Sequence, residues 1–332
     1  MRFFAFLSVF IGHVCLYFKV PSRHYPAGYG VELFFTLSAY LLTELMLREK
    51  EGDSLGRLDI KAFYIRRILR IWPLYFGFLF AVLCFVLSHS IPGVPLGSLA
   101  VFAMFLGDFP LAPPTSLLVV SLWSISLEEQ FYLLWPHVMR RLTRRRVVAA
   151  GATLWLLTIV IRWWIFMSGH GVFWLIVITR FDSLACGVLI VGLRPRSGPI
   201  LWFVGAACWI VATAYIFSPH PNPFLMTLAY ALVAVGCGAF LLGSIGANWM
   251  RNRALVYLGR ISYGLYIFHG GALLCVYSLF DPQAAWIGWT VCPLVALALT
   301  IAIAAASYRW LESPFLRLKQ RFQHVLSAAA TT

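Results

Sequence analysis

The chain is 332 residues long with a formal net charge of +14, yet only 11% of its residues are charged, against about 25% in a typical soluble protein. Hydrophobic residues make up 61% and aromatic residues 16%, which is more apolar surface than a soluble protein of this length can bury. The composition also excludes a disordered or collagen-like chain, and it predicts an all-α integral membrane protein.

The sequence predicts about ten transmembrane helices, since a span needs roughly 20 apolar residues. The expected ranges are 3–20, 29–47, 67–89, 117–139, 147–168, 172–193, 199–217, 224–246, 255–280 and 284–308. The stretch 97–110 is too short to span, so we expect a re-entrant or surface-lying piece on the outer side. No repeat, linker or soluble segment interrupts this pattern, so residues 1–332 are expected to form a single membrane domain with no fused soluble domain.

The positive charges predict the orientation of these helices. The sequence has 26 Lys and Arg residues. They lie at the N-terminus or in every second loop, with the exception of Lys19, Arg23, Arg162 and Arg180. Cytoplasmic loops of membrane proteins carry such an excess, so both termini are predicted to be cytoplasmic. This orientation accounts for the net charge, and no nucleic-acid partner is predicted.

Several kinds of chemistry find no support in the sequence. The seven cysteines all lie in apolar segments without a CxxC pair, which favours small packing residues over disulfides or metal ligands. Walker A, HExxH and Gly-x-Ser-x-Gly patterns do not occur either. The sequence therefore indicates no metal site, and no acyl-enzyme on a serine.

The first predicted helix carries a buried histidine in line with an arginine. Arg2 and His13 are eleven residues apart, and eleven steps of about 100° bring both side chains to one helix face, about 16 Å apart along the axis. An ionisable group at this depth is costly unless it lines a cavity or meets a partner, so the pair indicates a polar track from the cytoplasm. The alternative, that His13 only hydrogen-bonds a neighbouring helix, remains open.

Three arginines mark the start of the third predicted span. Arg66, Arg67 and Arg70 share one side of a helix, and guanidinium groups bind phosphates through paired, planar hydrogen bonds. Taken alone, they favour an ordinary cytoplasmic anchor.

Further ionisable residues lie within the predicted spans. Glu128 and Glu129 are adjacent and should point in different directions, so at most one faces a given cavity. Such a carboxylate either pairs with an arginine or handles a proton. Arg180 and Asp182 either pair with each other or make separate contacts. His269 is expected to lie closer to the outer leaflet than His13.

The chain resembles, over essentially its full length, the acyltransferase-3 family of multi-spanning bacterial O-acyltransferases. The matching segments are, in order, RFFAFLSVFIGH, GYGVELFFTLSAYLL, FYIRRILRIWPLY, WSISLEEQFYLLWP, RFDSLACG, LGRISYGLYIFH and YRWLESPF. Two departures occur in the second segment, where Glu32 replaces the family's usual Asp and Ala39-Tyr40 replaces its usual Gly-Phe. The resemblance implies transfer of an acyl group, often acetyl, from cytoplasmic acyl-CoA to a hydroxyl of a sugar or related acceptor.

Together, the residues and the resemblance predict an acyl-CoA-dependent O-acyltransferase, in first place an O-acetyltransferase, of the bacterial plasma membrane. Its expected partners are acetyl-CoA or another acyl-CoA as donor, a hydroxyl-bearing glycan or glycolipid as acceptor, and membrane lipids. Acyl-CoA is too anionic to cross a bilayer, so its phosphates need a cationic cytoplasmic site. The expected donor-binding residues are Arg2, Ser38, Arg66, Arg67 and Arg70.

The predicted catalytic residues are His13, Glu128 and His269. His13 is expected to act as general base towards the acceptor hydroxyl, with His269 as the competing candidate. Glu128 is expected to orient the histidine or a neighbouring cation. The alternative function is a transporter or flippase that moves a glycolipid or acyl group without covalent chemistry, although no transporter-like repeat is visible. A membrane scaffold would leave the buried ionisable residues unexplained.

Overall fold

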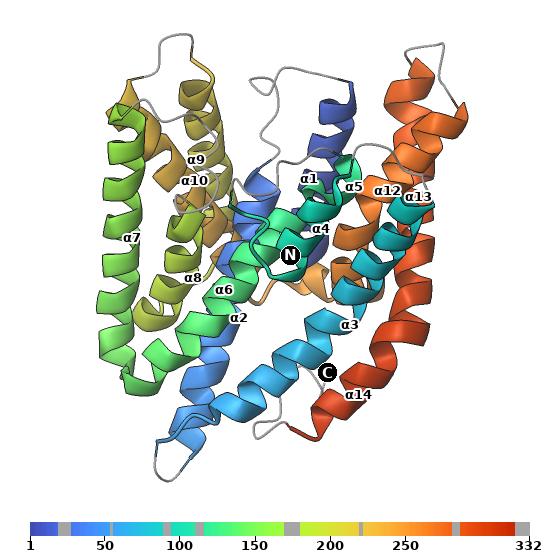
Figure 1. Ribbon diagram of the computed structural model, residues 1–332. Helices are drawn as coiled ribbons and strands as arrows, with labels where there is room; N and C mark the ends of the chain where they lie inside the picture. Colours follow the sequence, from blue (N-terminus) through green and yellow to red (C-terminus); the bar gives the residue numbers. More distant parts are fainter. Residues whose placement is uncertain are drawn as a thin grey trace. The chain divides into compact units, whose positions relative to one another are not determined.

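The computed structural model describes residues 1–18, 28–53, 56–88, 94–109, 116–168, 180–218, 222–280 and 286–322. Throughout these ranges the regular structure is helical and no strand occurs, as predicted (Figure 1). Seven helices are long and apolar enough to cross a membrane, and three shorter apolar ones accompany them: α1 (Arg2–Tyr17), α8 (Phe181–Leu193) and α9 (Ile200–Ile216). The chain is therefore an all-helical, multi-pass membrane protein.

The outer faces of several helices carry large apolar side chains. Leu156, Trp164, Phe203 and Leu294 are each more than 60% exposed. So many exposed large apolar side chains are unfavourable in water but match the hydrocarbon of a bilayer.

The helices form two compact units, each built from two separate stretches of sequence. The first unit comprises Met1–Glu44 and Leu142–Arg260. Its further helices are the part of α2 (Tyr29–Gly52) up to Glu44, α7 (Arg144–Met167), α10 (Pro223–Ser244), the 3₁₀ turn η4 (Asn248–Arg251) and α11 (Arg253–Arg260). Within this unit α9 packs along α10 and α7 packs along α8, as the green and yellow helices of Figure 1 show.

Two glycines set how closely helices approach in the first unit. A Cβ at Gly30 of α2 would collide with the backbone carbonyl of Ala5 in α1. A Cβ at Gly187 of α8 would likewise collide with the backbone of α2 at Thr36. Small residues at such contacts let membrane helices pack backbone to backbone, and here they hold α1 and α8 against α2.

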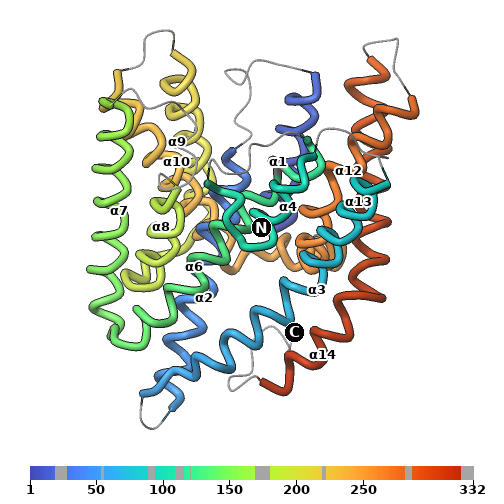
Figure 2. Tube along the Cα trace, viewed as in Figure 1, coloured from blue at the N-terminus to red at the C-terminus, as the bar shows by residue number. Residues whose placement is uncertain are grey.

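The second unit comprises Leu45–Arg141 and the described part of Ile261–Thr332 (Figure 2). Its helices are α3 (Ile60–Leu87), α4 (Leu96–Ala103), α5 (Leu117–Val120), α6 (Leu122–Arg141), α12 (Ser262–Phe280), the π turn η5 (Ile287–Val291), α13 (Cys292–Ser307), the π turn η6 (Tyr308–Glu312) and α14 (Ser313–Gln320). Here α12 packs along α13, and α3 contacts both α4 and α14.

The third predicted span begins earlier than its apolar run. α3 starts at Ile60 rather than near 67, because Asp59 caps it: the Asp59 carboxylate accepts a hydrogen bond of 2.8 Å from the Ala62 amide. Arg66, Arg67 and Arg70 therefore lie inside the helix and not at its entrance, which corrects the prediction.

Other predicted boundaries also shift. The span predicted at 117–139 is divided into α5 and α6 at Ser121, and the one predicted at 255–280 into α11 and α12. The last span runs on through two π turns to Gln320. Of the span predicted at 172–193, residues 172–179 lie outside the described part of the chain.

The short stretch predicted at 97–110 contains the helix α4. Its Ser98, Leu99 and Phe102 are buried, and α4 contacts both α3 and α6. Its other side is exposed at Leu96, Ala100 and Ala103, so α4 lies on the surface of its unit with one face packed, which agrees with a surface-lying piece.

The seven cysteines are all free thiols. Cys186, Cys237 and Cys292 are buried, as predicted for small packing residues. Cys84 and Cys275 are exposed, so the prediction of a core role is wrong for these two.

Candidate functional site

Arg2 and His13 lie on one unbroken helix. α1 has 16 residues, and Arg2 is its first residue while His13 belongs to its last turn and a half. Their spacing puts both side chains on one face, and both are half-buried in the first unit. Ser38 belongs to the same unit and is half-buried in the middle of α2.

Arg66 differs from the other two arginines of its cluster. It is 4% exposed, and its guanidinium donates 2.8 Å hydrogen bonds both to the Glu49 carboxylate and to the backbone carbonyl of Phe322. These two contacts join α2 and the chain after α14 to α3 within the second unit. Arg66 is therefore already committed to a structural ion pair.

Arg67 and Arg70 make fewer polar contacts than Arg66. The Arg67 guanidinium lies 5.5 Å from the ring centres of Phe63 and Tyr132, close enough for a cation–π interaction with each. Neither Arg67 nor Arg70 makes a hydrogen bond or ion pair with the described part of the chain, and the Arg67 Nε is buried without a partner there. The two residues are three positions apart on α3, so they share a face.

Glu128 and Glu129 point to different neighbours, as predicted. Glu128 accepts a hydrogen bond from the Tyr132 hydroxyl and lies near enough to Arg67 for an electrostatic interaction. Glu129 accepts a 3.2 Å hydrogen bond from the indole of Trp72. Arg67 also interacts electrostatically with Glu129, so the cation predicted as a possible partner of Glu128 lies near both carboxylates.

His269 is fully buried on α12 with both ring nitrogens engaged. Its Nδ1 lies 2.7 Å from the Tyr266 carbonyl, and its Nε2 lies 3.5 Å from the Ser121 hydroxyl at the joint of α5 and α6. One turn away, the hydroxyls of Ser124 and Tyr266 are 2.6 Å apart. These contacts tie α12 to α6 through polar side chains.

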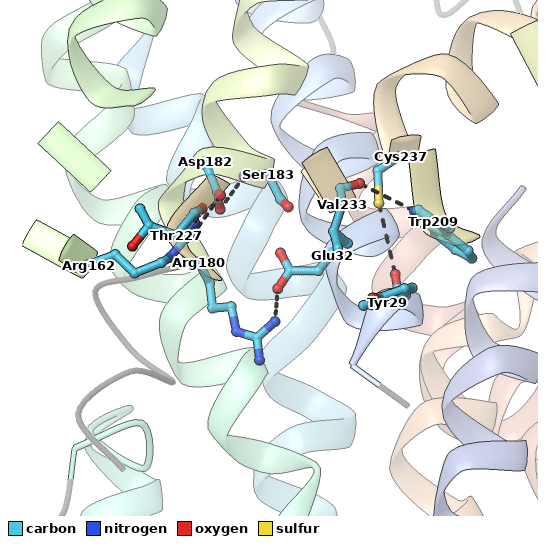
Figure 3. A network of polar contacts seen from close by, with 10 residues as sticks. All are labelled: Tyr29, Glu32, Arg162, Arg180, Asp182, Ser183, Trp209, Thr227, Val233 and Cys237. Atoms are coloured by element: carbon cyan, nitrogen blue, oxygen red, sulfur yellow. Dashed lines mark hydrogen bonds and ion pairs between the residues drawn. The ribbon is translucent and has the colours of Figure 1, made fainter. Parts of the chain in front are cut away.

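The first unit holds a second group of buried charges, shown in Figure 3. Arg180 forms an ion pair with Glu32, and Arg162 forms one of 2.7 Å with Asp182. The guanidinium of Arg180 lies 5.5 Å from the centre of the Tyr230 ring, and that of Arg162 lies 5.3 Å from it. Arg180 and Asp182 thus make separate contacts, which is the second of the two predicted alternatives.

This network is almost closed to solvent. Arg162, Asp182 and Glu32 are 1%, 2% and 3% exposed, and Arg162 also donates a 3.2 Å hydrogen bond to the carbonyl of Thr227. Two positive and two negative charges balance within it. The pairing of charges is typical of a structural role that joins α2, α7, α8 and α10, although the buried Glu32 Oε2 has no hydrogen-bond partner in the described chain.

Glu312, at the end of η6, is a buried carboxylate that was not among the predicted site residues. It is 3% exposed, and neither carboxylate oxygen has a hydrogen-bond partner in the described part of the chain. A signal was present, because Glu312 is the only acidic residue between Ile287 and Gln320.

The candidate residues divide between the two units. Arg2, His13 and Ser38 belong to the first, and the arginine cluster, Glu128 and His269 belong to the second. Within the second unit the structure brings Glu128 next to Arg67 and separates Arg66, by its ion pair, from the rest of the cluster. Among the described residues, no group of three or more His, Cys, Asp or Glu side chains is arranged to hold a metal ion.

Comparison with known proteins gives consistent matches. A family model described as an acyltransferase domain matches residues 1–309. The Staphylococcus aureus (strain COL) protein named "Putative O-acetyltransferase SACOL0978" is 26% identical, over 86% of this chain and 52% of its own length. "Putative peptidoglycan O-acetyltransferase YrhL" of Bacillus subtilis (strain 168) is 26% identical, over 95% of this chain and 54% of its own.

A third relative is "Peptidoglycan O-acetyltransferase OatA" of Listeria monocytogenes, which is 25% identical over 86% of this chain and 50% of its own. The chain thus spans about half the length of the curated relatives it matches. No solved structure matches it.

Proposed function

The chain belongs to the acyltransferase-3 family, and we propose that it is a membrane O-acyltransferase of the bacterial plasma membrane. Its donor is an acyl-CoA, with acetyl-CoA as first choice, and its acceptor is a hydroxyl of a sugar, glycan or glycolipid. Two of its relatives are named for peptidoglycan, which makes a cell-wall glycan the first acceptor to test. Ten spans with both termini in the cytoplasm would put the basic loops on the side where acyl-CoA is made.

The observation that carries the donor assignment is the contrast within the arginine cluster. Arg66 donates its hydrogen bonds to Glu49 and Phe322, whereas Arg67 and Arg70, on one face of α3, make no hydrogen bond or ion pair with the described part of the chain. Two guanidiniums in this arrangement suit the phosphates of CoA, because each can donate a pair of parallel hydrogen bonds. Two further donor-binding candidates lie in the first unit. They are Arg2 and Ser38, which belong to the first and second family segments.

The reaction would need only proton transfer and orientation from the protein. The acceptor oxygen attacks the thioester carbonyl, a new ester bond forms, and the carbon–sulfur bond breaks to release the CoA thiol. His13 would take the proton of the acceptor hydroxyl and pass it to the leaving sulfur. A histidine suits this role because its neutral form is a base near neutral pH.

Glu128 would act on Arg67 and not on a histidine. It lies close enough to Arg67 to attract its guanidinium, and the Tyr132 hydroxyl holds the carboxylate in place. Glu128 is therefore proposed as a positioning residue for the donor phosphates. His269, with both ring nitrogens engaged, suits a packing role better than that of a base.

A transfer assay tests the proposal directly. Purified protein in lipid nanodiscs is given acetyl-CoA labelled in the acetyl group, together with glycan fragments as acceptors. We expect labelled ester on the acceptor and free CoA thiol in equal amounts. In sealed vesicles, passage of label without any ester would support the transporter instead.

Binding experiments can separate the arginines. Arg67→Ala and Arg70→Ala should each weaken acetyl-CoA binding about 10-fold to 100-fold, the range of a lost hydrogen bond to a charged group. Lys at these positions should restore only part of the affinity, because an ammonium lacks the planar fork. Isothermal titration calorimetry on the purified variants measures the effect.

Two matched variants complete this experiment. Arg57→Ala removes an exposed arginine just before α3 and should bind as the wild type does. Arg66→Ala should lower the melting temperature, because it leaves the buried Glu49 unpaired. If both Arg67→Ala and Arg70→Ala bound acetyl-CoA as the wild type does, the arginine cluster would act only as a cytoplasmic anchor.

A further inference from the structure

Glu312 is the least satisfied carboxylate of the second unit. It is 3% exposed, and both of its oxygens lack a hydrogen-bond partner among the residues that the structure describes. A buried charged group without partners is strongly unfavourable, so natural proteins rarely keep one unless something else meets it. Glu312 also ends a π turn, a helix irregularity that often occurs at functional sites.

None of the side chains described near Glu312 donates a hydrogen bond to it. Glu129 has an unpartnered oxygen, and the carboxylates of Glu129 and Glu312 both lie close enough to Tyr263 for an electrostatic interaction. The Tyr263 hydroxyl cannot serve either carboxylate, because it donates to the carbonyl of Ile71 at 3.1 Å. Beside Glu312 lies Gly264, where a Cβ would come within 3.5 Å of the Glu312 Oε1.

Arg70 restricts what can bind here. It interacts electrostatically with Glu312 without a hydrogen bond or an ion-pair contact in the described chain. A bound cation would be repelled by that guanidinium, whereas a neutral group with several N–H or O–H donors would not. The ligand expected from this chemistry is therefore uncharged and donor-rich, and it lies next to a residue proposed to hold phosphates.

We propose that Glu312, together with Glu129, which like Glu312 lies near Tyr263, accepts hydrogen bonds from the pantetheine arm of the acyl donor. That arm is uncharged, with two amide N–H groups and one hydroxyl, and it follows directly on the phosphates assigned to Arg67 and Arg70. This inference rests on the proposed function, because it extends the donor site from the phosphates towards the thioester. The two glutamates are binding residues and take no part in bond making.

The test compares a ligand that has the arm with one that lacks it. Wild-type chain and Glu312→Gln are titrated with acetyl-CoA and with adenosine 3′,5′-bisphosphate, which carries phosphates but no pantetheine. Glu312→Gln should bind acetyl-CoA about 10-fold to 100-fold more weakly and the bisphosphate as the wild type does. Glu129→Gln, which keeps the acceptor for Trp72, should show the same selective loss, and Glu51→Gln on the exposed end of α2 should show none.

A second readout excludes a purely structural role. Without ligand, Glu312→Gln should melt at the same or a higher temperature than the wild type, because it removes an unpaired buried charge. Equal acetyl-CoA affinity in Glu312→Gln and wild type would overturn the inference, and so would equal weakening for both ligands. If the wild type bound neither ligand, the proposed function itself would fail.

Discussion

Replacing His13 by Gln should lower the rate of acyl transfer by a factor of about 10² to 10⁴, the usual contribution of a general base. Gln keeps hydrogen-bonding capacity in about the same volume but accepts no proton at neutral pH. The variant should therefore still bind acetyl-CoA and melt near the wild-type temperature. Initial rates of ester formation, with calorimetric binding as the control, measure this effect.

The matched variant is His269→Gln, because His269 is the other histidine of a family segment within a span. Its ring nitrogens contact the Tyr266 carbonyl and Ser121, so we expect a loss of stability and a much smaller loss of rate. Near-normal turnover in His13→Gln would refute the catalytic assignment. Loss confined to His269→Gln would move the base to α12.

Breaking the ion pair between Arg162 and Asp182 should have the largest effect on stability. Asp182→Ala leaves the guanidinium of Arg162, 1% exposed, without its carboxylate, and such a change costs about 3–5 kcal/mol. The expected result is a large fall in melting temperature and in the yield of folded protein from membranes. Thermal unfolding of the purified chain in one fixed detergent measures it.

A partly exposed pair provides the control. Arg144 and Glu44 are 3.5 Å apart and about 20% exposed, so Glu44→Gln should cost only about 0–1 kcal/mol. The double variant Arg162→Met, Asp182→Leu should recover much of the stability, because no unpaired charge remains. A wild-type melting temperature in Asp182→Ala would show that the network of Figure 3 contributes nothing to folding.

Apolar content was enough to predict the helices but not their ends. The helical class and most spans follow from runs of apolar residues, since a bilayer leaves a helix few alternatives. The start of α3 was missed because Asp59 caps it within a polar stretch, where hydropathy carries no signal. The division at Ser121 and the π turn η5 fall within apolar runs, so hydropathy gives no signal for them.

The sequence was enough to predict most of the residues of the candidate site, but not which of them pair with one another. Spacing alone predicted that Glu128 and Glu129 would diverge, since successive residues of a helix point apart. It could not separate Arg66 from Arg67, because the partner of Arg66, Glu49, lies on another helix. Glu312 was missed for a similar reason: its lack of partners becomes visible only when α3, α12 and η6 are packed together.

Because the ribosome makes these helices in chain order, the buried charges cannot pair as soon as each is synthesised. Glu32 is separated from Arg180 by 148 residues, all of which must be synthesised before the two can pair. At about 5–20 residues per second, that interval lasts roughly 7–30 seconds. During it, α2 has to be shielded from lipid by the insertion machinery or carry a protonated carboxyl at Glu32, because a bare carboxylate is costly in hydrocarbon. The first unit can thus close only after its second stretch, Leu142–Arg260, has been made, although α1 and α2 precede that stretch by about 100 residues.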